Sequence, residues 1–249
     1  IPYLARVCER LAPVPKKKRE PRAVQFSHID FSLIDTPALG IAESEKELMV
    51  MARRVSKSSE LVKEIITSTN NRRRLCDKVL REEKAIDEYQ KYITEFLVTL
   101  SSSALSEGDA NHVCNYMTLS HNLEKFADHL EHITLIFDKI DRKNMKLPDE
   151  ARERIDKIFT ENVNFFNYSL KALKENVDPQ TFMSKSQVIN RRVKKIIKET
   201  KIAHLSEVGK KVVKNNTAIH YMDILNFLDG MRSQAYNMSE VTSGTKYNI

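Results

Sequence analysis

Residues that interrupt helices are rare in this chain and stand far apart. The 249 residues include five glycines and seven prolines, and five of the prolines lie within residues 1–40. From Ile41 onward, the remaining breaks delimit six segments of about 30 residues, a length that corresponds to a helix of about 45 Å. These breaks lie at Ser68–Asn71, Gly108, Pro148, Pro179 and Gly209.

Apolar residues recur at helical spacing within these segments. In the second segment the recurring residues are Leu75, Val79, Ile86, Ile93, Leu97 and Leu100. In the third they are Leu123, Ala127, Leu130, Ile133, Phe137 and Ile140. A stripe of this kind needs partner helices to bury it, and short connections place consecutive helices antiparallel. No segment shows a competing strand-like alternation, so the sequence predicts an all-α fold.

The six predicted helices divide into two sets of three, with Leu147–Pro148–Asp149 between the sets. Residues 122–133 align without gaps with residues 227–238, which favours an internal duplication. We therefore expect two pseudo-symmetric antiparallel three-helix bundles. The expected organisation is a lead-in over residues 1–40, a first bundle over 41–147 and a second bundle over 148–249.

Several classes of function are disfavoured by composition and motifs. The net charge is +7, but no stacking aromatics accompany the basic runs, which argues against nucleic-acid binding. The three cysteines are far apart, which indicates reduced cytosolic thiols without a disulfide or a cysteine zinc site. The motifs of serine hydrolases, P-loop proteins and dinucleotide-binding proteins are absent, so we expect no enzymatic activity.

The lead-in has its own character. No apolar run reaches the 18 residues that suggest a membrane span. Residues 1–14 are mildly apolar and Pro15–Arg22 is strongly basic, a pattern typical of cytoplasmic juxtamembrane segments. An irregular chain end explains the same residues equally well. Since the chain begins with Ile1, we expect it to be part of a longer protein.

Two pairs of acidic residues at i, i+4 spacing are the best candidates for a binding site. Glu83 and Asp87 lie in the second segment, and Glu124 and Asp128 lie in the third, with Glu131 one turn further. This spacing places both carboxylates of a pair on one helix face. Glu83 also lies on the apolar stripe, where an acid is costly unless it is paired or ligated.

Two such pairs on adjacent antiparallel helices can form a four-carboxylate cage for a hard or borderline cation. His129 or His132 could add nitrogen ligands. The alternative is that the acids are solvated and neutralised by nearby lysine or arginine. A ferritin-like di-iron site is not favoured, because the sequence contains no Glu-x-x-His motif.

The stretch Leu123–Glu124–Lys125–Phe126–Ala127–Asp128–His129, followed by Ile133, resembles the PhoU signature L-E-R-I-G-D-H-x-x-N-I. Residues 29–52 resemble the start of the PhoU region at the C-terminus of sodium-dependent phosphate transporters of the Na/Pi-cotransporter II type. Residues 218–240 resemble the second PhoU repeat of that group. Together the resemblance covers about residues 29–242.

The resemblance implies two three-helix bundles in which E/D-x-x-x-D motifs hold a transition-metal cluster, iron or zinc in members of the family. Carried onto this chain, the implied ligands in the first bundle are Glu83, Asp87, Glu124 and Asp128. The second bundle departs from the pattern, because Ser186, Ser233 and Gln234 stand where ligands are expected. We therefore expect one metal site, in the first bundle, and a hydrogen-bonded polar cluster at the degenerate second site, formed by Asn190, Asp229 and Asn237.

The resemblance implies a metal-binding regulatory domain of a sodium-dependent phosphate transporter, which modulates phosphate uptake from the cytoplasmic side of the inner (plasma) membrane. Its expected partner is the membrane transport domain of the same polypeptide, and phosphate and a second copy of the chain are further candidates. The alternative is a free-standing PhoU-type adaptor that acts on an ABC phosphate importer and a sensor kinase. A metal-free helical scaffold and a metal-dependent phosphate-ester hydrolase are weaker alternatives.

Overall fold

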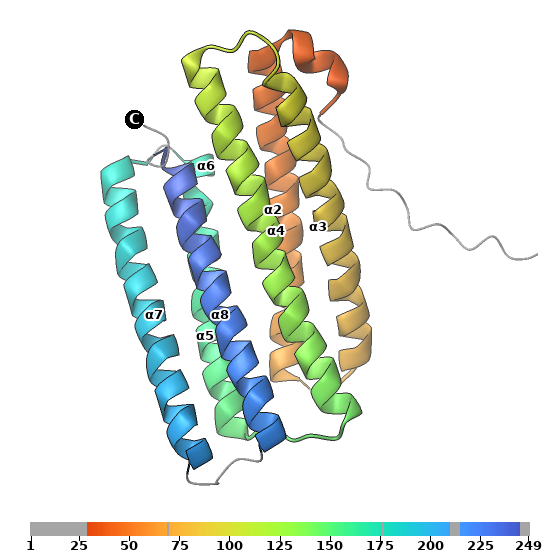
Figure 1. Cartoon of the computed structure of the whole chain (residues 1–249), viewed down its shortest axis with the longest axis vertical. Helices are drawn as coiled ribbons and strands as arrows, with labels where there is room; N and C mark the ends of the chain where they lie inside the picture. The colour runs from red at the N-terminus through yellow and green to blue at the C-terminus, as the bar shows by residue number, and fades with distance from the viewer. Residues whose placement is uncertain (1–28, 69, 176, 210–214, 245–249) are drawn as a thin grey trace, which may run out of the picture.

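The computed structural model describes residues 29–68, 70–175, 177–209 and 215–244, so most of the lead-in lies outside the described residues. The described part is helical and contains no strand. The elements are η1 (Phe31–Asp35), α2 (Pro37–Thr67), α3 (Arg72–Leu100), α4 (Glu107–Arg142), α5 (Asp149–Ser169), α6 (Lys171–Lys174), α7 (Pro179–Gly209) and α8 (Asn215–Thr242). The long helices run side by side along the length of the molecule (Figure 1), which confirms the all-α fold.

The helices end near the predicted breaks, with local differences. Helix α2 begins at Pro37, inside the predicted lead-in, because proline suits the first helical position, where an N–H has no helical partner. Helix α4 begins at Glu107, so the predicted break at Gly108 lies within its first turn. Ser106 caps this helix, since its Oγ accepts a hydrogen bond from the Asp109 backbone N–H at 3.1 Å.

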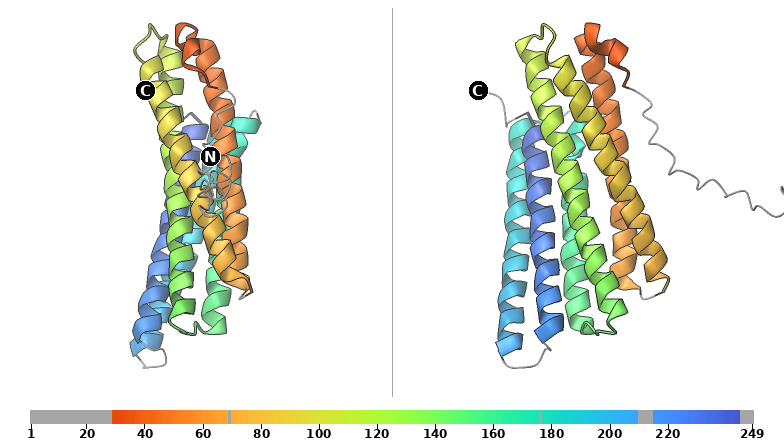
Figure 2. Two further views of the ribbon diagram at one scale, coloured as in Figure 1. Left: turned by 90° about the vertical axis from the view of Figure 1, so that its right-hand side faces the viewer. Right: turned by 45° about the vertical axis from the view of Figure 1, so that its right-hand side comes forward.

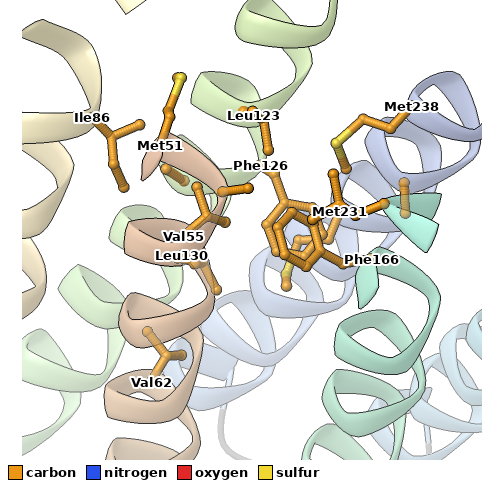
Figure 3. Packing of buried hydrophobic residues seen from close by; sticks show 14 of the residues in the cluster. Met51, Val55, Val62, Ile86, Leu123, Phe126, Leu130, Phe166, Met231 and Met238 are labelled. Carbon is orange, nitrogen blue, oxygen red and sulfur yellow. The ribbon is translucent and has the colours of Figure 1, made fainter. Parts of the chain in front are cut away.

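The two sets of three helices pack directly against each other. Helices α2, α3 and α4 form the first unit, and α5, α7 and α8 form the second. Helix α4 lies along α8, and α2 contacts α5, so the units share one hydrophobic core. Figure 3 shows Phe126 of α4 beside Phe166 of α5, with their ring centroids 4.6 Å apart.

Helices α3 and α7 are the outer helices of the assembly. Helix α3 packs on α2 and α4, and α7 packs on α8 and α5 (Figures 1 and 2). Among the described residues, no helix combines the length and the apolar character that a membrane span requires. The arrangement leaves the α3–α4 seam and the outer face of α7 as the two surfaces of functional interest.

Candidate metal centre

Successive acids of α3 face different neighbours. Glu82 accepts hydrogen bonds from Arg54 and Lys57 of α2, at 2.9 Å and 2.7 Å. Glu83, one residue on, lies within electrostatic range of the α4 acids Glu124, Asp128 and Glu131. The one-residue step rotates the side chain by about 100° around the helix, so Glu82 is paired with bases while Glu83 joins other carboxylates.

The predicted acids lie within electrostatic range of Glu83. Burial, followed by the charges of four other carboxylates, raises the pKa of Glu83 to about 7. In order of effect, these carboxylates are Glu131, Asp87, Asp128 and Glu124. Burial also raises the pKa of Glu124, with a further increase from Asp128, although the hydrogen bond from Lys125 lowers it. The four predicted ligands and Glu131 therefore form one acidic cluster on the α3–α4 seam.

Two lysines neutralise part of this acidic cluster. Lys125 Nζ lies 2.7 Å from an Asp128 oxygen and 3.1 Å from a Glu124 oxygen. Lys91 Nζ lies 2.7 Å from Asp87 Oδ2. Among the ion pairs of the described residues, none involves Glu83. The alternative of acids neutralised by bases thus holds for three of the four predicted ligands.

The donor chemistry of the acidic cluster fits a metal, but its present arrangement is not that of a formed site. Carboxylate oxygens suit hard and borderline cations. Within the described ranges, however, no three acidic, histidine or cysteine side chains are placed so that they could hold one ion. Because the Lys125 ammonium lies between Glu124 and Asp128, it is the group that a metal ion would have to displace.

Neither histidine that we considered as an additional ligand joins the acidic cluster. The ring of His129 lies against Gly230 of α8, where a Cβ atom would be 2.3 Å from its Nε2. The ring of His132 stacks on Phe227 of α8, with centroids 4.7 Å apart. Burial, and then the nearby His132, lower the pKa of His129 to about 4, so it is neutral at physiological pH. Both side chains serve the α4–α8 interface instead.

A histidine that we did not predict, His121, lies beside one of the acids. His121 Nδ1 is 3.8 Å from Glu124 Oε2, and the imidazole is 58% exposed. The signal was present in the sequence, because His121 and Lys91 stand at i−3 and i+4 from Glu124 and Asp87, respectively. Basic residues at these spacings predict that the acidic cluster also contains bases.

The corresponding part of the second unit contains an arginine. Arg232 Nε donates to Asp229 Oδ1 at 2.7 Å, and Arg232 Nη1 donates to Asn190 Oδ1. Lys201 Nζ lies 3.7 Å from the other Asp229 oxygen. Two members of the expected polar cluster, Asn190 and Asp229, are thus joined through a guanidinium that is only 12% exposed. Asn237 is partly buried, and none of the hydrogen bonds of the described residues joins it to this group.

Comparison with known proteins gives a match for one part of this chain. Residues 48–136 match the family model described as PhoU domain. The matched stretch runs from α2 through most of α4 and contains the whole acidic cluster. Comparisons with curated proteins and with solved structures gave no match.

Proposed function

We propose that this chain is a regulatory domain in phosphate homeostasis and that its acidic cluster binds a transition-metal ion. The PhoU match over residues 48–136 supports the regulatory assignment, which includes no catalytic step. The observation that carries the metal site is the convergence of four carboxylates on Glu83, an acid without a basic partner among the described ion pairs. The proposed ligands are Glu83, Asp87, Glu124 and Asp128, with Glu131 beside them.

A bound cation would offset the repulsion among these acids. Iron or zinc is our first choice of metal, from the family resemblance, and a metal held by carboxylates would supply positive charge and Lewis acidity for an anion such as phosphate. The residues of this chain provide the oxygen donors and the partly buried surroundings that strengthen charge interactions. Lys125 provides the competing charge that keeps Glu124 and Asp128 paired in the absence of metal.

We further propose that the domain acts on a sodium-dependent phosphate transport unit at the cytoplasmic face of the plasma membrane. The support is the likeness of residues 29–52 to such transporters, together with the basic, juxtamembrane-like stretch Pro15–Arg22. Sodium-dependent phosphate uptake by cells that carry the complete protein tests this assignment. A change in uptake caused by Glu83→Gln/Asp128→Asn supports the assignment. A change in sensor-kinase signalling without any change in uptake favours the free-standing adaptor.

Metal content tests the binding site itself. The purified chain is loaded with Fe²⁺ or Zn²⁺, desalted and analysed by mass spectrometry of the elements. We expect bound metal in the wild type and its loss in Glu83→Gln/Asp128→Asn. Glu95→Gln is the matched control, because Glu95 is an exposed acid of α3 about 18 Å along the helix from Glu83. Equal metal content in all three proteins would leave the metal-free scaffold as the better account.

Substitution of Lys125 tests the competition. Lys125→Met removes the ammonium that lies between Glu124 and Asp128, so we expect metal affinity to rise at least about fivefold. Lys84→Met, which changes an exposed lysine of α3, is the control and should leave the affinity unchanged. An unchanged or lower affinity in Lys125→Met would show that the metal does not displace this lysine.

A further inference from the structure

The outer face of α7 carries a stripe that none of the other described helices covers. The stripe repeats in steps of three or four residues, so its members share one helix face. We call this set the α7 stripe: Val188, Arg191, Lys195, Lys198, Ile202 and Leu205. It combines three apolar and three basic residues and contains no acid. Helix α7 lies at the edge of the assembly, as Figures 1 and 2 show.

The apolar members of the α7 stripe are unusually exposed for their size. Val188 and Ile202 are each 58% exposed, and Leu205 is 60% exposed. Val193 and Ile197, on the opposite face of the helix, are almost fully buried in the core. The buried side chains on the core-facing side therefore hold α7 in the fold. The exposed apolar side chains of the stripe do not contribute to this packing.

The basic members of the α7 stripe are only weakly neutralised. Helix α7 contains seven lysines and arginines against two glutamates. The stripe's one described ion pair joins Lys195 and Glu199 at 3.9 Å, and Lys195 is 77% exposed in it. Ion pairs this exposed contribute little. The face therefore presents net positive charge together with apolar side chains.

We propose that the α7 stripe docks the protein on the surface of an anionic lipid bilayer. From Val188 to Leu205 the stripe is about 26 Å long, and a helix at the edge of a bundle can lie flat on a membrane. Apolar side chains can enter the interface while lysine stems extend toward the lipid phosphates. A protein partner fits less well, because lysine is depleted at the centres of protein interfaces. The inference rests on α7 and not on the acidic cluster.

Co-sedimentation of the full chain with vesicles tests the proposal. We expect binding to mixed phosphatidylglycerol–phosphatidylcholine vesicles and little binding to pure phosphatidylcholine. Lys195→Glu/Lys198→Glu should weaken binding to the anionic vesicles at least about 20-fold. Ile202→Ser/Leu205→Ser should weaken it without any change in charge. Because all four side chains are exposed, the variants should keep the melting temperature and the metal content of the wild type.

A charge-matched control distinguishes the effect of the α7 stripe on vesicle binding from the effect of the net charge of the chain. Lys84→Glu/Lys146→Glu makes the same change at exposed positions on α3 and before α5, and it should retain most of the binding. Equal loss in both charge variants would overturn the proposal, because attraction would then depend on net charge alone. Absence of vesicle binding by the wild type would also overturn it. A third contradicting result would be that substitutions in the α7 stripe weaken the binding of an acidic helical peptide but leave vesicle binding unchanged.

Discussion

Glu83 lies between Val79 and Ile86 on α3, and both of these neighbours are fully buried. An acid at such a position loses the favourable packing of an apolar side chain and adds an unfavourable desolvation free energy. Here it also adds repulsion from four other carboxylates. A residue of this kind lowers the stability of the metal-free protein. A bound cation would offset this loss of stability.

The first prediction follows from this cost. In metal-free protein at pH 8, above the pKa of about 7, Glu83 is charged in both the folded and the unfolded state. Glu83→Gln removes the charge, so we expect it to increase the free energy of unfolding by about 1 kcal/mol after allowance for solvent screening. Urea titration measures this change. Glu95→Gln should have no comparable effect, and a destabilised Glu83→Gln would show that the native acid is favourably paired.

The second prediction concerns the two described cysteines. Burial, and then the charge of Asp138, raise the pKa of the Cys76 thiol to about 11, and its side chain is 4% exposed. Cys114 is exposed. Since the thiolate is the reactive form, iodoacetamide should alkylate Cys114 and spare Cys76 in native protein from pH 7 to 9. Peptide mapping distinguishes the two sites, and rapid labelling of Cys76 would contradict the packing around it.

At the residue scale, the sequence predicted the acids better than their partners. The i, i+4 spacing and the apolar stripe indicated that Glu83, Asp87, Glu124 and Asp128 share the α3–α4 seam, and their role as metal ligands stays a prediction. The directions of the His129 and His132 side chains depended on α8, which is distant in the sequence, so no local pattern could place them. Lys125 was visible in the sequence, but its position between two acids depends on its rotamer.

At the scale of elements, the contact between α4 and α8 depends on a glycine. Gly230 lets the two helices approach so closely that a Cβ atom there would meet three atoms of the His129 ring at 2.3–2.9 Å. That ring is itself confined by Phe227, with centroids 6.0 Å apart. The side-chain-free position on α8 thus explains why His129 lies within this interface and away from the acidic cluster.

The third prediction tests this contact. Gly230→Ala should lower the free energy of unfolding by about 2 kcal/mol, because an overpacked interface outweighs the better helix propensity of alanine. Gly108→Ala is the matched control, since the nearest atom to its new methyl group would be 3.9 Å away. Thermal denaturation compares the two. If the clash is the cause, His129→Ala should recover part of the loss in the Gly230→Ala protein, and the absence of any loss would contradict the close approach.

The boundaries of the elements were predictable where breakers stand alone. Pro148 and Pro179 mark the starts of α5 and α7 as expected, and Gly209 ends α7. The sequence did not predict that the fourth segment divides into α5 and the short α6. The backbone there contains neither glycine nor proline between Leu170 and Lys174, and α6 packs on α8. Such a division depends on tertiary contacts.

At the scale of the whole molecule, the two units share a single core. Figure 3 shows Leu123 and Phe126 of the first unit close to Phe166 and Met231 of the second. The periodicity of each helix predicted that it had a buried face, but the pairing of α4 with α8 joins residues about 100 positions apart in a way that local patterns do not specify. The sequence thus predicted two sets of helices, but it did not predict how extensively they pack against each other.

The fourth prediction follows from the shared core. Differential scanning calorimetry of the full chain should show one transition, with equal calorimetric and van't Hoff enthalpies. A chain that ends at Leu147 should melt at a lower temperature and bind a hydrophobic dye, because it exposes the α4 surface that α8 covers. Two separate transitions in the full chain would show that the units unfold independently.

The central claim is that the acidic cluster on α3 and α4 binds a metal ion. The most direct measurement is anomalous X-ray scattering, at the absorption edge of the loaded metal, from crystals of the full chain soaked in Fe²⁺ or Zn²⁺. The account predicts an anomalous peak among Glu83, Asp87, Glu124 and Asp128, with Lys125 moved away from Glu124 and Asp128. Crystals in which Lys125 still bridges these two acids and no peak lies on the α3–α4 seam would contradict it.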